Sequence, residues 1–201
     1  MMQVPVANES DWVRSDWIGR VVAALKDSGA PDSPASLQAL RDRLVPLAWA
    51  AGCPRADAFV RAGDDERFRR HPLEIPEVPD CSALVMVWPP GYATLPHDHA
   101  GLWGIELVID GALEVDEFIP VGSSSRPTLA LARSLYLGLG DAAVFSGDAY
   151  VHRCRNLSTT RAALSLHVYG GVLDTYRSFL IDTSGRYRAR AEIARSDATL
   201  S

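Results

Sequence analysis

The stretch "WGIELVIDGALEVDEFI", residues 103–119, holds two short runs of apolar and β-branched residues separated by Asp110 and Gly111. Aspartate and glycine favour turns, whereas valine and isoleucine favour strands, so this stretch predicts two short strands. Four runs of the same kind surround it: "SALVMVW" at 82–88, "SLYLGL" at 134–139, "AAVFS" at 142–146 and "AALSLHVYG" at 162–170. Many short strands at close spacing predict a sandwich or barrel.

The first fifty residues instead predict two helices. Asn8 or Ser10 can cap a helix whose apolar positions recur at helical spacing as far as Leu25. A second helix is expected to begin near Ser33, with a proline in its first turn, and to end at "GCP", residues 52–54.

Two segments are expected to be irregular. "VGSSSRPT", residues 121–128, predicts an exposed loop, and the polar C-terminal segment 183–201 is expected to fray. The chain is therefore predicted to be one mainly β domain, residues 1–201, in which helices within 1–55 pack on a barrel formed by 67–190.

Composition excludes several classes of partner. The formal net charge is -5 with only 20 lysines and arginines, so no basic surface for nucleic acid is indicated. No apolar run approaches the roughly 18 residues that cross a bilayer, and the N-terminus lacks the pattern of a secretory leader. We expect a cytoplasmic monomer or small homo-oligomer, with its three widely spaced cysteines reduced.

The histidines supply the first candidate site. His97 and His99 lie one residue apart in "LPHDHAGLWG", and if they occupy a strand they face the same way, about 7 Å apart along the chain. His152, in "GDAYVHRCRN", can add a third imidazole from another strand. Three neutral imidazoles suit a first-row divalent metal such as iron, zinc, copper or nickel. The alternative is that each is an ordinary, partly buried polar residue.

A second cluster is "SLHVY", in which Ser165, His167 and Tyr169 alternate and therefore share one face of a strand. A hydroxyl, an imidazole and a phenol in a row can form a hydrogen-bonded relay. The alternative is that these three side chains form the exposed face of a strand whose apolar residues are buried.

Together, "LPHDHAGLWG", His152 followed by "RCRN", and "SLHVYGGVLDTY" resemble the cysteine dioxygenase family of thiol dioxygenases, which are cupin barrels. The intervals agree as well: His152 follows His99 by 53 residues, and Ser165 follows His152 by 13. The resemblance is clearest from about residue 67 to 185. It implies that His97, His99 and His152 hold mononuclear Fe(II).

The resemblance also implies roles for the "SLHVY" strand and a reaction. Ser165, His167 and Tyr169 would form the family's triad beside the iron. A thiol and O2 would be the substrates, and both oxygen atoms would end on sulfur as a sulfinate.

Three positions depart from the family's pattern. Gly104 stands where animal members carry a cysteine that crosslinks to the triad tyrosine, and where many other cupins place a glutamate ligand. Glu106, two residues after Gly104, would point to the same inner side of a strand, and a glutamate at this position is unusual for the family. We expect it to be a buried group beside the ligands, or to adapt the pocket to a cationic substrate. Gly170 and Gly171 replace the family's Ser-Pro.

Substrate choice is predicted from "RFRRHPL", residues 67–73. The resemblance places Arg70 where cysteine dioxygenases carry an arginine for the substrate carboxylate, with Arg69 as the alternative register. A bidentate arginine contact is strong and directional. We therefore expect L-cysteine, with 3-mercaptopropionate or another thiol such as mercaptosuccinate as the alternative. Trp103 and Tyr92 can line the entrance or belong to the core.

Two other classes of function stay open from the sequence. One is a non-catalytic cupin that binds a small acid, which has no need of the Ser165 to Tyr169 relay. The other is a zinc hydrolase, because three histidines and a water also describe catalytic zinc, with Glu106 as the available general base.

Overall fold

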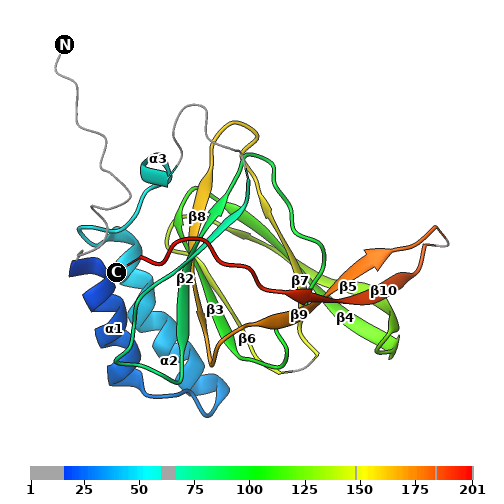
Figure 1. Ribbon diagram of the computed structural model, residues 1–201, viewed down its shortest axis with the longest axis horizontal. Helices are drawn as coiled ribbons and strands as arrows, with labels where there is room; N and C mark the ends of the chain where they lie inside the picture. Colours follow the sequence, from blue (N-terminus) through cyan, green and yellow to red (C-terminus); the bar gives the residue numbers. More distant parts are fainter. Residues whose placement is uncertain (1–15, 60–66, 148, 184, 201) are drawn as a thin grey trace.

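The computed structural model describes residues 16–59, 67–147, 149–183 and 185–200 (Figure 1). The helical part comprises α1 (Asp16–Ser28), α2 (Pro34–Leu44), the 3-10 helix η2 (Val45–Trp49) and α3 (Ala56–Phe59). The strands are β1 (Arg69–Pro72), β2 (Ser82–Trp88), β3 (Gly104–Asp110), β4 (Leu113–Ser123), β5 (Arg126–Leu137), β6 (Ala142–Phe145), β7 (Val151–Asn156), β8 (Ala163–Tyr169), β9 (Thr175–Ile181) and β10 (Tyr187–Ile193). None of the helices in these ranges is long and apolar enough to cross a membrane.

The strands form three antiparallel sheets. The largest has the order β1-β2-β8-β3-β6, the second has the order β5-β4-β7, and β9 pairs with β10 alone. The predicted fold class, mainly β with N-terminal helices, is confirmed, although the three sheets do not close into one continuous barrel. Figure 1 shows α1 and α2 side by side at one end of the molecule, against the largest sheet.

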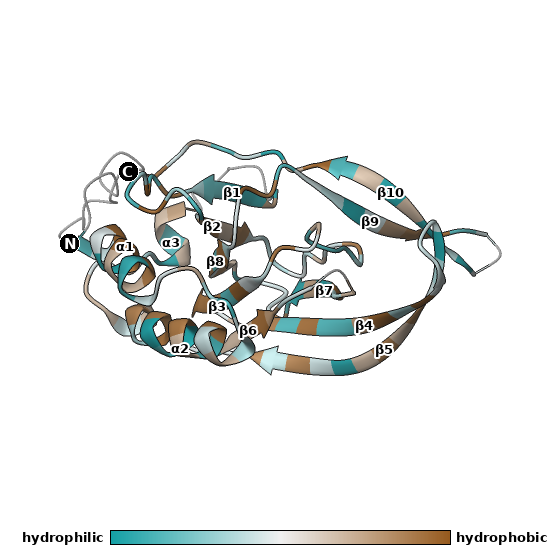
Figure 2. Cartoon of the chain, turned by 90° about the horizontal axis from the view of Figure 1, so that it is seen from below, coloured by the Kyte–Doolittle hydropathy of each residue, from teal (hydrophilic) through white to brown (hydrophobic). Residues whose placement is uncertain are grey.

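The largest sheet is buried on both faces, and its two faces differ in composition. On the outer face, apolar side chains of β2, β3 and β8 pack against the helices in one core cluster. On the inner face, the alternate residues of the same strands meet β4 and β7 and include the buried polar residues Glu106, Ser165 and His167. In Figure 2 the hydrophobic sides of the helices lie toward β2, β3 and β8.

The second helix begins where the sequence predicts but ends earlier than residues 52–54. The Ser36 N–H donates to the Ser33 side chain, and the Ser33 N–H donates to the Ser36 side chain, which together form a capping box. The expected start of the second helix is therefore confirmed. The helix gives way to a 3-10 turn after Leu44, because Pro46 has no N–H to continue the α-helical ladder. The expected cap at Asn8 or Ser10 lies outside the described residues.

Both segments that were expected to be irregular contain paired strand. Across 121–128, β4 and β5 remain paired as far as Ser123 and Arg126, so only two residues form the turn. In the C-terminal segment, β10 pairs with β9, and Leu200 is 5% exposed in the core. The prediction of fraying was wrong because backbone pairing, rather than an apolar pattern, holds this polar segment in place.

Candidate active site

His97 and His99 lie in the segment between β2 and β3, not in a strand as predicted. The chain is fixed there by two backbone hydrogen bonds with β7: the His97 N–H donates to the His152 carbonyl (2.8 Å), and the His152 N–H donates to the His97 carbonyl (3.0 Å). After His99 the chain turns at Ala100, whose φ of +52° lies in the left-handed region, and enters β3. Direct pairing with His152 therefore replaces strand alternation as the reason that the imidazoles meet.

The three imidazoles converge on one point. One ring nitrogen from each of His97, His99 and His152 lies within 4.8 Å of the other two. The Nε2 atoms of His97 and His152 are 3.1 Å apart. Two nitrogens that each lie about 2.1 Å from one metal, in neighbouring ligand positions, are separated by roughly 3.0–3.4 Å, so this spacing fits a shared ion.

The hydrogen bonds behind the rings also fit a metal site. The His97 Nδ1 must donate to the Leu95 carbonyl (2.9 Å), because a carbonyl only accepts, so its Nε2 presents a lone pair to the cavity. Behind His152, the Tyr150 hydroxyl lies 3.3 Å from Nδ1 and donates its own proton to Glu117 (3.4 Å). His99 has a buried Nδ1 without a hydrogen-bond partner among the described residues. An unpaired buried nitrogen costs free energy unless something binds there.

Burial keeps these imidazoles uncharged. Desolvation lowers the pKa of His97, and it lowers the pKa values of His99 and His152 well below the ordinary value, with the neighbouring imidazoles adding to the effect. A neutral imidazole is the form that binds a metal. Three such ligands and no obligatory thiolate suit a first-row divalent ion without selecting one.

The predicted relay on β8 is continuous, and it is buried rather than exposed. The Ser165 Oγ lies 2.8 Å from His167 Nε2, and His167 Nδ1 lies 3.1 Å from the Tyr169 hydroxyl. All three side chains face inward and are at most 2% exposed. The alternative that they form the outer face of a strand is therefore wrong.

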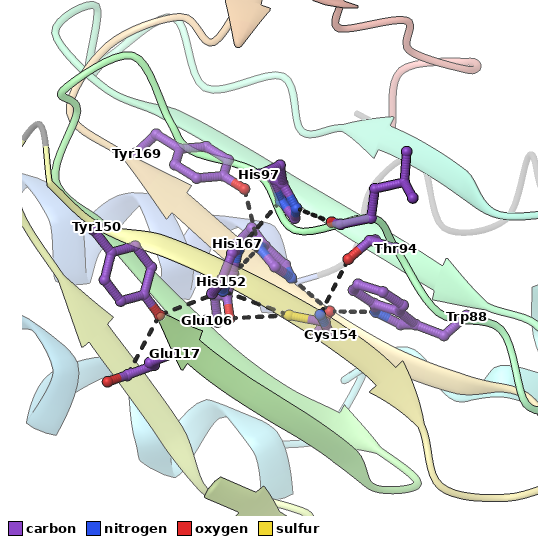
Figure 3. Close-up of polar contacts among 12 residues, drawn as sticks. Trp88, Thr94, His97, Glu106, Glu117, Tyr150, His152, Cys154, His167 and Tyr169 are labelled. Atoms are coloured by element: carbon purple, nitrogen blue, oxygen red, sulfur yellow. Dashed lines mark hydrogen bonds and ion pairs between the residues drawn. The ribbon is translucent and has the colours of Figure 1, made fainter. Parts of the chain in front are cut away.

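Trp88 of β2 extends this relay and gives it a direction (Figure 3). Its indole N–H donates to the Ser165 Oγ (2.7 Å), and because an indole nitrogen only donates, the Ser165 hydroxyl proton is directed to His167 Nε2. Burial lowers the pKa of His167 to about 3, so the ring is neutral and carries its one proton on Nδ1. That proton faces the Tyr169 oxygen, which leaves the hydroxyl proton of Tyr169 free to serve another acceptor.

Glu106 of β3 lies between the imidazole cluster and the relay. Its Oε1 is 3.4 Å from His152 Nε2 and 3.5 Å from His167 Nδ1, yet it makes no hydrogen bond among the described residues. Its Oε2 accepts a hydrogen bond from the Cys154 thiol (3.7 Å). Burial raises the pKa of Glu106 to about 8. Glu106 groups with His152 and Cys154 rather than with all three histidines, so it does not complete a four-residue cluster.

The candidate substrate arginines face opposite ways. Arg70 pairs with Met86 on the inner face of β2 and lines a cavity of about 240 Å³ that also contains the three histidines. Arg69 pairs with Val87 on the outer face, and its guanidinium donates to the Phe59 carbonyl. Of these two candidates, Arg70 is the one that lines the cavity, which Arg190 of β10 lines as well.

Of the two aromatic residues considered for the entrance, one lines the cavity and the other does not. Tyr92 lines the cavity and stacks on Phe68, with ring centroids 5.1 Å apart. Trp103 is not among the cavity-lining residues of the described chain and instead packs with the helix-side cluster. Its indole covers Gly170, where a Cβ would come within 2.1 Å of the indole nitrogen. The position of Trp103 therefore gives no support to a contact with substrate.

Gly104 is explained by packing. A Cβ at this position would lie 2.2 Å from the ring of Phe145, so neither a cysteine nor a glutamate fits there without a shift of that ring. Phe145 in turn stacks on His99, with ring centroids 4.3 Å apart. The departure of Gly104 from the family pattern thus accompanies an aromatic support for one of the imidazoles.

Sequence reasoning missed residues that hold the site from behind. Asp98, between the two histidines, points away from the cavity and accepts hydrogen bonds from the backbone and the guanidinium of Arg177 on β9 (2.8 and 2.6 Å). Phe145 and Trp88 were missed as well, because each acts through a partner distant in sequence. Tyr150 was also missed, although its partner His152 is only two residues away. The only available signal was parity: Trp88 alternates with Met86 on the inward face of β2.

Known proteins resemble this chain in sequence over much of its length and in structure more distantly. The model of the family "Cysteine dioxygenase type I" matches residues 64–181.

Among solved structures, KdgF from Halomonas sp. is 20% identical, with a TM-score of 0.42 over 56% of this chain and 86% of that one. Oxalate oxidase in complex with the substrate analogue glycolate is 20% identical, with a TM-score of 0.41 over 56% of this chain and 55% of that one. The cupin domain of Schizosaccharomyces pombe Cnp3 is 13% identical, with a TM-score of 0.39 over 52% of this chain and 65% of that one. This chain therefore spans about half of the oxalate oxidase chain, and we assign no residue role from these distant structures.

Proposed function

This chain belongs to the cysteine dioxygenase type I family, a cupin family, and we propose that it is an Fe(II)-dependent thiol dioxygenase. In the proposed reaction a small thiol that carries a carboxylate combines with one O2, and the product is the sulfinic acid. The atoms balance without another reductant, since both oxygen atoms end on the sulfur. The cytoplasmic location and the monomeric or small oligomeric state expected from the sequence belong to this proposal.

The residues proposed to hold the iron are His97, His99 and His152. The support is that their neutral nitrogens converge within 4.8 Å and that three ligands leave other coordination positions open. Iron(II) bound there would supply the redox chemistry, and its charge would favour the thiolate form of the substrate.

The other proposed roles follow from contacts of the protein itself. Arg70 would bind the substrate carboxylate, because its guanidinium faces the cavity and no acceptor among the described residues contacts it. Tyr169 would donate its hydroxyl proton to a group in the cavity, because the proton on His167 already serves the tyrosine oxygen. Ser165 and Trp88 would keep His167 in that tautomer.

L-cysteine is the substrate that we propose first. The cavity combines an arginine with the buried Oε1 of Glu106, which has no hydrogen-bond partner among the described residues; an α-amino thiol carries a carboxylate for the arginine and an ammonium group that can donate to this oxygen. 3-Mercaptopropionate and mercaptosuccinate lack the amino group, so they would leave the Glu106 oxygen without a donor. The convergence of three neutral imidazoles beside the Ser165 to Tyr169 relay is the observation that carries the proposal.

The test is to load the metal-free protein with Fe(II) without oxygen, add air with each of the three thiols, and follow oxygen uptake together with sulfinate by mass spectrometry. We expect one sulfinate for each O2 consumed, with the highest kcat/KM for L-cysteine. Oxygen uptake without sulfinate, or turnover of none of the thiols, would contradict the proposal. In the second case, binding of the thiols without reaction identifies the non-catalytic cupin, and ester hydrolysis by the zinc-loaded protein identifies the hydrolase.

A further inference from the structure

The C-terminal segment 197–200 lies along the free edge of β1, the strand that carries Arg70. Two hydrogen bonds join Asp197 to the backbone of Arg70: the Arg70 N–H donates to the Asp197 carboxylate (2.9 Å), and the Asp197 N–H donates to the Arg70 carbonyl (2.7 Å). Farther along, the Leu200 N–H donates to the Pro72 carbonyl (2.7 Å) and the Leu200 carbonyl accepts from Glu74 (2.7 Å). Figure 1 shows this segment, in red, returning from β10 toward the helices.

The segment acts on a strand that has little other support. β1 is only four residues long and is the end strand of its sheet, so β2 pairs with one of its edges. An edge strand presents unpaired N–H and C=O groups along its other side. The C-terminal segment forms hydrogen bonds with this free edge of β1. Asp197 makes its hydrogen bonds at Arg70, whose side chain faces the cavity.

Asp197 is itself held in place. Arg67 donates to its second oxygen (2.7 Å), and the side chain of Asp197 is 18% exposed, against 60% for Arg67. Burial opposes ionisation of Asp197, but the hydrogen bonds from Arg70 and Arg67 outweigh it, so its pKa lies below the usual range. The carboxylate is thus a fixed, charged acceptor for the Arg70 backbone.

The guanidinium group of Arg70 is not held in the way that its backbone is. None of the described residues accepts a hydrogen bond from its guanidinium, so its direction depends on the backbone from which it extends. A contact with a carboxylate requires placement to a fraction of an ångström. On this ground, and resting on the function proposed above, we infer that Asp197 is a positioning residue that fixes Arg70 for the substrate carboxylate.

The test is a double-mutant cycle of Asp197→Ala and Arg70→Gln, with kcat and KM measured for L-cysteine. We expect Asp197→Ala to raise KM about fivefold and to change kcat less than about twofold. This is the size expected when one hydrogen bond to a charged group is lost from the backbone of Arg70 and not from the substrate itself. In the Arg70→Gln background the same change should alter KM less than about twofold, because the contact that it positions is already absent. Equal effects in both backgrounds, or no effect in either, would overturn the inference.

Two further variants separate positioning from general stability. Asp197→Asn keeps an oxygen that can accept from the Arg70 N–H, so its KM should stay within about twofold of the wild-type value. Leu200→Ala weakens the buried end of the same segment, so it should lower Tm but leave KM unchanged. If Leu200→Ala raises KM as much as Asp197→Ala does, the segment acts only through stability and the inference fails.

The outcome also distinguishes this inference from the proposed function. If the wild-type protein turns over none of the carboxylate-bearing thiols, the proposed function fails and the inference fails with it. If it turns over L-cysteine and the cycle shows no coupling between Asp197 and Arg70, only the inference fails. Amide hydrogen exchange adds a readout that is independent of turnover: the Arg70 amide should exchange faster in Asp197→Ala and not in Asp197→Asn.

Discussion

The two faces of the largest sheet come from the same strands but serve different ends. On β3, Ile105 and Leu107 face the helices and are fully buried, whereas Glu106 between them faces the cavity. On β8, Leu166 faces the helices, whereas His167 faces the cavity. Burial of apolar area stabilises the fold, whereas a buried polar group costs free energy unless it is paired. Strand parity therefore keeps the stabilising residues and the reactive groups on opposite sides of one sheet.

The largest effect should come from the inner face. We expect His152→Ala to weaken Fe(II) binding by at least about hundredfold, because it removes the imidazole whose ring centroid lies closest to those of the other two, at 4.5 and 4.7 Å. Anaerobic equilibrium dialysis against Fe(II), with bound iron counted by mass spectrometry, measures this. Circular dichroism of the metal-free variant should show the wild-type fold. Unchanged iron binding would remove His152 from the site.

The matched change on the outer face should lower stability and leave Fe(II) binding unchanged. Leu166→Ala empties a fully buried position against the helices, so the free energy of unfolding should fall by about 2–5 kcal/mol, as measured by urea denaturation of the metal-free protein. Its affinity for Fe(II) should remain that of the wild type. A folded Leu166→Ala protein that no longer binds iron would show that the two faces are not independent.

Two neighbouring arginines on β1 repeat the comparison within one strand. Arg70→Gln removes a charge that faces the cavity, so KM for L-cysteine should rise about tenfold to a hundredfold. Arg69→Gln removes a contact with the Phe59 carbonyl on the helix side, so it should change stability and leave KM within about twofold. Steady-state oxygen uptake on both variants decides the register, and a larger effect from Arg69 would reverse our assignment.

The smallest effect that we predict comes from a pair of buried indoles. Trp88→Phe removes the N–H that orients Ser165, so kcat should fall about fivefold with little change in KM. Trp17→Phe removes a similar hydrogen bond, to the Leu47 carbonyl on the helix side, and should leave kcat unchanged. Equal losses of kcat in the two variants would mean that the orientation of the relay does not matter for the reaction.

Much of the fold was readable from the sequence because the relevant strands are apolar on at least one face. β2 coincides with the predicted 82–88, since every residue after Ser82 is buried. β10 was missed because none of its residues is fully buried, so no apolar pattern marks it. Backbone pairing with β9 holds that strand, and pairing between distant segments leaves little trace in composition.

The candidate site was reached from the sequence partly for a wrong reason. The prediction that His97 and His99 meet because they alternate in a strand fails, since a loop bound to β7 brings them together. Asp98 anchors that loop to Arg177 and could not be identified, because its partner lies 79 residues away. Trp103 was left open between the entrance and the core, and its ring packs against the helix-side cluster and fills the space above Gly170.

The central claim is that His97, His99 and His152 share one metal ion and leave room beside it for substrate. Anomalous diffraction at the iron edge, on crystals grown without oxygen in the presence of Fe(II), tests it most directly. The account predicts one anomalous peak in the cavity, within bonding distance of all three imidazoles and not of the Glu106 carboxylate. A peak elsewhere, or one at which Glu106 occupies a ligand position, would contradict it.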